Sequence, residues 1–307
     1  MTFAGFGSAG RLFLNERQSM GFRRRVRSRC LPFALFALLA ALSACDNEIP
    51  EPPEPQVAKT DPLRGNINVA IHSDQPGWGY TTNGFQYSGF DYDLGNWLGG
   101  EIGFNPTWIG ASAGQRDDLL INGKVKLVLA TYSITDERKK TVSFAGPYIV
   151  TQQGILVRTG YKKINKVADF AGKSACAVLG TTSLAQLEGQ MDKKRITAEQ
   201  GLSTCVERLL KGDVEMVSTD QLVLRGYASK NPDKLAVVEG LTFGYKEMYG
   251  VGLPHGNGAY CQEITAALKR FIESGAWDNF FRKHFPGIPD SDQYRPDPGA
   301  LDPCPAT

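Results

Sequence analysis

Residues 67–71 read Ile-Asn-Val-Ala-Ile, and residues 91–102 read Asp-Tyr-Asp-Leu-Gly-Asn-Trp-Leu-Gly-Gly-Glu-Ile. The first stretch is a short apolar run of the kind that forms a buried strand, whereas the second repeats apolar residues at helical spacing. Another helical stretch follows over residues 115–121, and another strand over residues 125–130. Strands and helices that alternate in this way predict an α/β fold built around a layered sheet.

The alternation continues through the second half of the chain. The predicted strands cover residues 155–157, 174–178, 214–218, 235–238 and 249–253, and the predicted helices begin at Thr181 and cover 203–210, 221–228, 260–274 and 276–284. Pro286 ends the last helix, because proline has no amide hydrogen and its ring clashes with the preceding turn. With 307 residues, the chain is long enough for one large domain or two medium ones.

The N-terminus has the organisation of a bacterial export signal. Five arginines between residues 23 and 29 precede the apolar stretch 31–42, which is too short to span a bilayer. The sequence Leu-Ser-Ala-Cys that ends at Cys45 resembles a lipobox, in which the cysteine sulfur is lipidated and the chain is cut before it. We therefore expect a signal peptide over residues 1–44, with Met20 as an alternative start, and a lipid anchor that holds the protein outside the cytoplasm. The alternative is an ordinary signal with an incidental cysteine.

The rest of the chain is slightly acidic. The net charge is +2, but residues 1–45 hold seven of the 34 basic residues and one of the 32 acidic ones, which leaves 27 − 31 = −4. This charge lacks the basic footprint of a nucleic-acid-binding protein. Residues 45–64 contain five prolines after the cysteine and predict an extended linker between the lipid and the folded part.

The cysteines also agree with export. Cys30 leaves with the signal, and the remaining four can form two disulfides in an oxidising compartment, with three possible connectivities; they are Cys176, Cys205, Cys261 and Cys304. The cysteines form no C-x-x-C pair and the three histidines are scattered, so we expect no zinc site. Phosphate-loop and serine-nucleophile motifs are also missing from the sequence, and we expect neither a cofactor nor an enzymatic activity.

Five motifs then occur in a fixed order. They are Gly-Phe-Asp-Tyr-Asp-Leu at 89–94, Ala-Thr-Tyr-Ser-Ile-Thr-Asp-Glu-Arg at 130–138, Phe-Ala-Gly-Pro-Tyr at 144–148, Gly-Thr-Thr-Ser at 180–183 and Ser-Thr-Asp at 218–220. Together they resemble the family 3 bacterial extracellular solute-binding proteins, which are the receptors of polar amino acid ABC transporters. Asp-Gln-Pro-Gly at 74–77, Gln115-Arg116 and the spacing of Cys176 and Cys205 look closest to the actinobacterial glutamate-binding lipoproteins.

The resemblance implies a two-lobe, type II periplasmic-binding-protein fold, with two hinge strands and a ligand cleft between the lobes. The expected parts are lobe 1 over 65–152 plus 245–287, lobe 2 over 153–244, hinges near 151–154 and 244–250, and a C-terminal tail over 288–307. The expected protein is a monomer that closes on a small ligand and presents the closed form to ABC permease subunits.

The same resemblance implies a grip on the amino acid zwitterion. Arg138, Ser133 and the amide of Thr182 would hold the α-carboxylate, which an arginine can bind with two parallel hydrogen bonds. Asp220 and the carbonyl of Thr131 would accept the α-ammonium. Taken alone, Arg138 would be a solvated charge and Asp220 a helix cap.

The ligand side chain would meet Arg116, His72, Asp74 and Thr181. A buried Arg116 would select glutamate over glutamine, because a neutral amide leaves its charge unpaired. Asp74 argues the other way, since an acidic residue favours an amide or a cationic ligand. Glutamate is therefore the expected ligand, with glutamine, aspartate and asparagine as alternatives. Trp78, Tyr80 or Phe90 could form a wall of the pocket or belong to the core.

The implied lobes also bear on the disulfides. Cys176 and Cys205 would lie in lobe 2, whereas Cys261 would lie in lobe 1 and Cys304 in its tail. A receptor that opens and closes would be locked by a disulfide between lobes, so we expect Cys176–Cys205 and Cys261–Cys304. Two other functions stay open at this point: an amino acid sensor without a transport role, and a dehydratase or hydrolase on the same scaffold.

Overall fold

The computed structural model describes residues 63–302 and 304, all of which lie in one compact unit. The expected signal peptide, lipidation at Cys45 and most of the linker lie outside the described residues. The strands are β1 Gly65–Ile71, β2 Asp74–Gln75, β3 Gly79–Tyr80, β4 Phe104–Gly110, β5 Leu127–Val128, β6 Val142–Arg158, β7 Ala175–Val178, β8 Ile196–Glu199, β9 Met216–Asp220, β10 Leu235–Val237 and β11 Phe243–Pro254. The helices are α1 Phe90–Ile102, α2 Arg116–Ile121, α3 Thr182–Glu188, α4 Leu202–Lys211, α5 Gln221–Lys230, α6 Gly258–Glu273 and α7 Ala276–His284, with short 3-10 turns between them.

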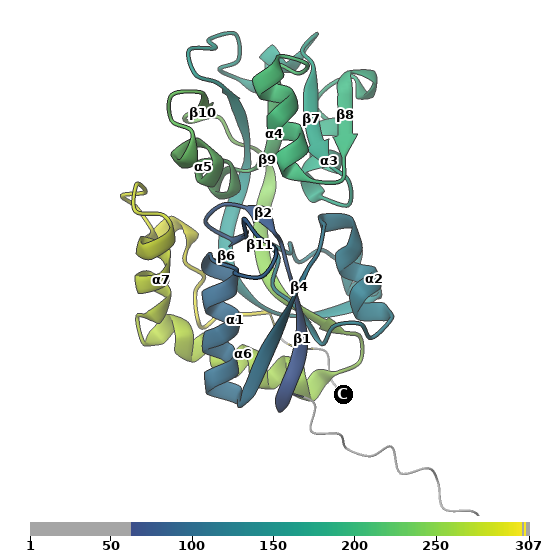
Figure 1. The fold of residues 1–307 in the computed structure, drawn as a ribbon, viewed down its shortest axis with the longest axis vertical. Helices are drawn as coiled ribbons and strands as arrows, with labels where there is room; N and C mark the ends of the chain where they lie inside the picture. Colours follow the sequence, from purple (N-terminus) through teal and green to yellow (C-terminus); the bar gives the residue numbers. More distant parts are fainter. Residues whose placement is uncertain (1–62, 303, 305–307) are drawn as a thin grey trace, which may run out of the picture. The chain divides into compact units, whose positions relative to one another are not determined.

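One sheet runs through both lobes. Its strand order is β4-β1-β5-β11-β6-β9-β7-β8, with β10 paired to β6. The outer strands of each half are parallel to their neighbours, whereas β6 and β11 pair antiparallel along most of their length. Figure 1 shows these two long strands passing between a first lobe, with β1, β4, β5, α1, α2, α6 and α7, and a second lobe, with β7 to β10 and α3 to α5. This is the two-lobe α/β fold that the sequence predicted.

The two connecting strands blur the boundary between the lobes. The division expected at residues 152/153 falls inside β6, and the division at 244/245 falls inside β11. Both strands therefore contribute to each lobe, and the division at those bonds stays a proposal. The register of β6 and β11 shifts between Phe243 and Glu247, close to the second expected hinge.

The start of α1 explains the first motif of the sequence. Gly89 precedes the helix with φ of 128°, and a Cβ there would lie 1.9 Å from the carbonyl oxygen of Trp78. Only glycine fits such a close approach. Trp78 and Phe90 are fully buried and pack on each other with ring centroids 5.7 Å apart, so these two aromatics belong to the core of the first lobe.

Each of two disulfides joins two segments of the same lobe. Cys176 of β7 joins Cys205 of α4, and Cys261 of α6 joins Cys304 of the tail, which are the pairs expected above. The tail also packs on the first lobe through Tyr294, whose ring stacks on Phe281 at 5.5 Å. Within residues 63–302 and 304, no helix is both long and apolar enough to cross a membrane.

Candidate functional site

Two adjoining cavities lie where the lobes meet. The larger has a volume of about 280 Å³ and is lined by residues of both lobes: His72, Ser73, Asp74, Gln75, Ala111, Ser112, Ala113, Val178, Thr181, Gln200, Gly201, Leu202, Ser203 and Thr219. The smaller measures about 20 Å³ and is lined by His72, Gln75, Ala113, Arg116, Thr131, Ser133, Arg138, Thr181, Thr182, Ser183, Thr219 and Asp220. Because five residues line both cavities, the two form one continuous site.

Arg138 reaches across the cleft from the turn that precedes β6. Its guanidinium donates to the carbonyl of Ser133 at 2.7 Å and to the carbonyl of Gly180, in the second lobe, at 2.9 Å. It also lies over the ring of Tyr132, 4.8 Å from the centroid. These contacts fix a cation at the cleft while other N–H groups of the fork stay available for a carboxylate.

Arg116, at the start of α2, is the second cation of the site and is 2% exposed. It donates to the carbonyls of Ala113, Ala130, Thr131 and Gly180 at 2.9, 2.8, 3.0 and 3.3 Å. Burial, and then the like charge of Arg138, lower the pKa of Arg116 to about 10, so the guanidinium stays charged at neutral pH. Both arginines therefore converge on the carbonyl of Gly180.

Thr131 holds a strained backbone conformation at this point. Its φ of 41° is unusual for a β-branched residue. The amide of Thr131 donates to Asp91 of α1 at 3.0 Å, and its hydroxyl donates to Gln75 at 3.1 Å. Asp91 is fully buried, and burial raises its pKa to about 6. The carbonyl of Thr131 accepts from Arg116 at 3.0 Å, so this oxygen already has a donor.

Asp220 ends β9 in the second lobe and is 5% exposed. Its carboxylate accepts from the amide of Gln153 at 2.7 Å and from the hydroxyl of Tyr249. Burial, and then the charge of Glu247, raise the pKa of Asp220 to about 8. The sequence suggested a helix cap for this residue, but its side chain makes no capping hydrogen bond to α5.

The start of α3, in the second lobe, forms part of the lining of the smaller cavity. Thr181 is its N-cap residue, and its hydroxyl accepts from the amide of Leu184 at 3.1 Å while donating to the carbonyl of Val178 at 2.6 Å. Thr182 and Ser183 follow and line the smaller cavity. The start of α3, whose first amides have no partner within the helix, therefore borders the smaller cavity.

His72 lines both cavities and is 2% exposed. Its Nδ1 lies 3.0 Å from the carbonyl of Ala111 and must donate, because a carbonyl only accepts. Burial, helped by the charge of Arg116, lowers the pKa of His72 to about 4. The ring is therefore neutral at pH 7, and its Nε2 is a buried acceptor without a partner in the described part of the chain.

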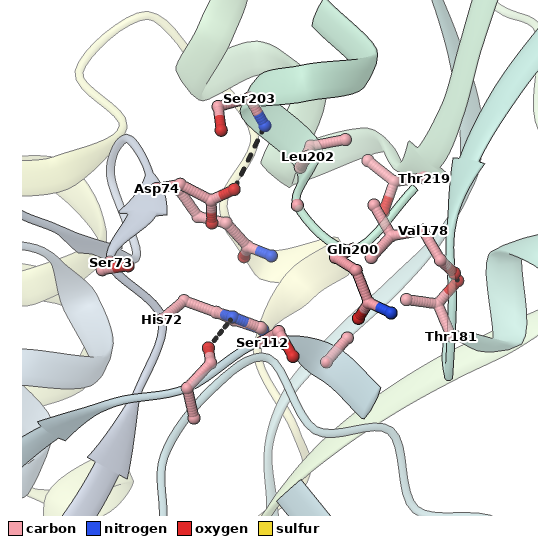
Figure 2. Close-up of a pocket in the computed structure, with 14 residues that line it drawn as sticks. His72, Ser73, Asp74, Ser112, Val178, Thr181, Gln200, Leu202, Ser203 and Thr219 are labelled. Atoms are coloured by element: carbon pink, nitrogen blue, oxygen red, sulfur yellow. Dashed lines mark hydrogen bonds between the residues drawn. The ribbon is translucent and has the colours of Figure 1, made fainter. Parts of the chain in front are cut away.

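Asp74 borders the larger cavity but is already engaged. Its Oδ2 accepts from the amide of Ser203 at 3.1 Å, as Figure 2 shows. Ser203 lies in the first turn of α4, whose own N-cap residue, Gly201, has no side chain for capping. A carboxylate of the first lobe therefore caps a helix of the second lobe.

Every residue predicted to hold the zwitterion lines the smaller cavity, namely Arg138, Ser133, Thr182, Asp220 and Thr131. Of the predicted side-chain group, His72 and Thr181 line both cavities, Arg116 lines only the smaller one, and Asp74 lines only the larger one. Their contacts with a ligand stay a prediction.

Sequence reasoning missed several lining residues, including Gln75, Ser112, Gln200 and Thr219. Gln75 stood inside a quoted motif, but Gln200 lies in a loop with no pattern to mark it. The aromatic residues that could have formed a wall of the pocket, Trp78, Tyr80 and Phe90, are not among the residues that line these two cavities. Within the described residues, no group of three or more His, Cys, Asp or Glu could hold a metal ion.

Comparisons with known proteins identify relatives of the chain. Residues 67–287 match the bacterial extracellular solute-binding proteins, family 3. The glutamate-binding protein GluB of Corynebacterium efficiens is 31% identical over 231 residues, which cover 72% of this chain and 79% of that protein.

Solved structures share the fold. An ancestral arginine-binding protein bound to glutamine has a TM-score of 0.68 and 28% identity, with 72% of this chain and 98% of that chain covered. The ancestral amino acid-binding protein AncCDT-1, a precursor of cyclohexadienyl dehydratase, has a TM-score of 0.64 and 26% identity, with coverage of 72% and 96%.

Proposed function

Because the chain belongs to the bacterial extracellular solute-binding proteins, family 3, we propose that it captures glutamate between its two lobes for an ABC importer. Proteins of this family bind amino acids outside the cytoplasm and deliver them to a permease. The α-carboxylate of the ligand lies against Arg138, Ser133 and the amide of Thr182. Its ammonium lies against Asp220. Because the ligand touches both lobes only when they are close together, its binding stabilises the closed form.

The net charge of the side chains that line the smaller cavity favours glutamate as the ligand. The lining includes two cations, Arg116 and Arg138, and one acidic side chain, Asp220. With His72 neutral, the charge of this lining is +1 when Asp220 is ionised and +2 when Asp220 is protonated. A neutral amino acid would leave this charge uncompensated, whereas glutamate carries a net charge of −1. A buried charge without a partner is costly, so the site favours the acidic ligand. The glutamate-binding relative supports the same choice.

Glutamine is the second candidate, and the larger cavity favours it. Its lining contains amides, hydroxyls and Asp74, but no arginine or lysine. A ligand side chain that extends into this cavity would reach Gln200 and the serines rather than Arg116. One solved relative is described as bound to glutamine.

We propose binding without catalysis. The two acids that line the cavities already have partners, since the Ser203 amide donates to Asp74, and Gln153 and Tyr249 donate to Asp220. The relatives that the chain matches are named as amino acid-binding proteins, which also supports binding without catalysis. A sensor role would use the same closed form, and adjacent permease and ATPase genes would distinguish transport from sensing.

We also propose that Cys45 carries a lipid that anchors the protein to the cell membrane. The arginine-rich start, the apolar stretch 31–42 and the Leu-Ser-Ala-Cys sequence support this proposal. Mass spectrometry of the purified protein should find a diacylglyceryl group on Cys45 and no residue before it. An unmodified cysteine would contradict the anchor.

Calorimetric titration of the purified protein with glutamate, aspartate, glutamine, asparagine and arginine tests the ligand. We expect glutamate to bind tightest, by about 100-fold over glutamine. Arg116→Gln should reduce this preference at least tenfold, because the unpaired charge is gone. Arg158→Gln is the matched control, since Arg158 also donates to backbone carbonyls, at Leu209 and Val214, but in the second lobe away from the cleft. Tighter binding of glutamine to the wild-type protein would overturn the assignment.

A further inference from the structure

Two buried carboxylates lie next to each other behind the ammonium site. Asp220 is 5% exposed and Glu247, on β11, is 1% exposed. The amide of Gln153 on β6 donates to both, at 2.7 Å to Asp220 and 2.9 Å to Glu247. A single NH₂ group therefore bridges two acids.

The remaining partners of the pair are neutral. Tyr249 donates its hydroxyl to Asp220, and Gln186 of α3 donates its amide to Glu247. None of the hydrogen bonds or ion pairs of the described residues joins either carboxylate to a lysine or an arginine. Arg116 and Arg138 act on Asp220 only at longer range, and Tyr245 is the other titratable group near the pair.

Two like charges in such a position cannot both persist without compensation. Burial penalises each carboxylate, and mutual repulsion adds to that penalty. One of the two must therefore hold a proton or meet a cation. Burial first, and then the nearby charge of Glu247, raise the pKa of Asp220 to about 8, in agreement with this requirement.

We propose that Asp220 and Glu247 share one proton in the ligand-free protein, and that the ammonium of the bound amino acid displaces this proton to solvent. This inference rests on the proposed function, since it needs an ammonium beside Asp220. In the exchange, the O–H bond of the acid breaks, the proton passes to buffer, and the carboxylate pairs with the intact ammonium. Glu247 is then a positioning residue, because it acts on the ligand through Asp220 and Gln153.

The proton is detected by calorimetry of glutamate binding in buffers with different ionisation enthalpies. At pH 7, a group with a pKa of about 8 is about 90% protonated, so about 0.9 proton should leave per ligand. Affinity should rise about tenfold from pH 6 to pH 7 and level off above about pH 8, because the proton is then already absent. This measurement uses the unaltered protein and does not depend on the folding of a variant.

Glu247→Gln identifies the source of the proton. The new amide can still accept from Gln153 and Gln186, but it removes the repulsion on Asp220. We expect proton release at pH 7 to fall below about 0.3, with unchanged or tighter binding. Glu215→Gln is the matched control, because Glu215 also receives a tyrosine hydroxyl and a backbone amide but lies outside the two cavities.

The outcomes separate the two proposals. Binding with an enthalpy that is the same in every buffer, or a Glu247→Gln variant that releases as much proton as the wild-type protein, overturns the shared proton while amino acid capture stands. Failure of every amino acid to bind overturns both. The inference is supported if the wild-type protein releases a proton on binding, and if Glu247→Gln reduces this release while Glu215→Gln does not.

Discussion

At the scale of single residues, the burial of His72 makes the stability of the fold depend on pH. The folded protein holds this ring neutral, with its pKa lowered to about 4, whereas the unfolded chain titrates near 6.5. Between these values the unfolded state binds more protons, so stability falls as the pH falls from 6.5 toward 4. The loss from His72 between pH 7 and pH 5 is about 2 kcal/mol.

His72→Asn should remove that part of the slope, because its amide can still donate to Ala111 but does not titrate. Urea unfolding at pH 7 and pH 5 measures it, and His255→Asn, at an exposed position, is the control. Equal slopes in the wild-type protein and in His72→Asn would contradict this prediction. They would mean that the pKa of His72 is the same in the folded and the unfolded state.

The sequence showed which residues could form the site, but it did not show which partners their side chains would contact. The positions of Arg138, Thr182 and Asp220 followed from motifs, whereas the four carbonyls around Arg116 come from three separate segments of the chain. Glu247 stood in no quoted motif, and its importance appears only when β11 brings it beside Asp220. Charges that meet through tertiary pairing leave no local pattern for a sequence to show.

At the scale of elements, the cap on α4 couples the two lobes. Asp74 accepts from the Ser203 amide, and the hydroxyl of Tyr227 on α5 donates to the Asp74 carbonyl. We expect Asp74→Ala to weaken binding of every amino acid by about 5- to 10-fold, because a helix cap contributes about 1 kcal/mol and this one requires closed lobes. Asp192→Ala is the control, since Asp192 caps a turn within the second lobe alone.

Titration calorimetry of both variants with glutamate and glutamine decides the role of Asp74. A change in the ratio of the two affinities, rather than in both equally, would instead make Asp74 a specificity residue. The sequence could not distinguish these roles. It placed Asp74 at the cleft, but the amide that Asp74 accepts from, at Ser203, lies 129 residues away along the chain.

Most elements were predictable because their apolar spacing is local. α7 has the predicted bounds, and α4 and α6 differ from prediction by one or two residues. β6 was predicted only over 155–157 but runs through 17 residues, because its middle contains polar side chains that pair across the hinge. β8 was missed for a related reason, since this edge strand has no apolar run.

At the scale of the whole molecule, closure of the two lobes brings the backbone of one lobe close to the backbone of the other. Gly180 of the second lobe has φ of +75°, and a Cβ there would lie 2.6 Å from the Cα of Gly114 in the first lobe. Gly180→Ala should therefore hold the lobes apart and reduce affinity for all amino acids at least tenfold, while the unliganded fold loses about 1 kcal/mol from the left-handed backbone.

Gly172→Ala isolates the effect of closure from the effect of strain. Gly172 has nearly the same φ, +76°, but nothing lies within 4 Å of its Cβ position. Both variants should lose similar stability in thermal unfolding, because the backbone cost is shared. Only Gly180→Ala should lose affinity and, in small-angle scattering with saturating glutamate, keep the larger radius of gyration of the open form. If both variants bind and compact like the wild-type protein, the contact between Gly114 and Gly180 is not required for capture, and ligand must bind without this degree of closure.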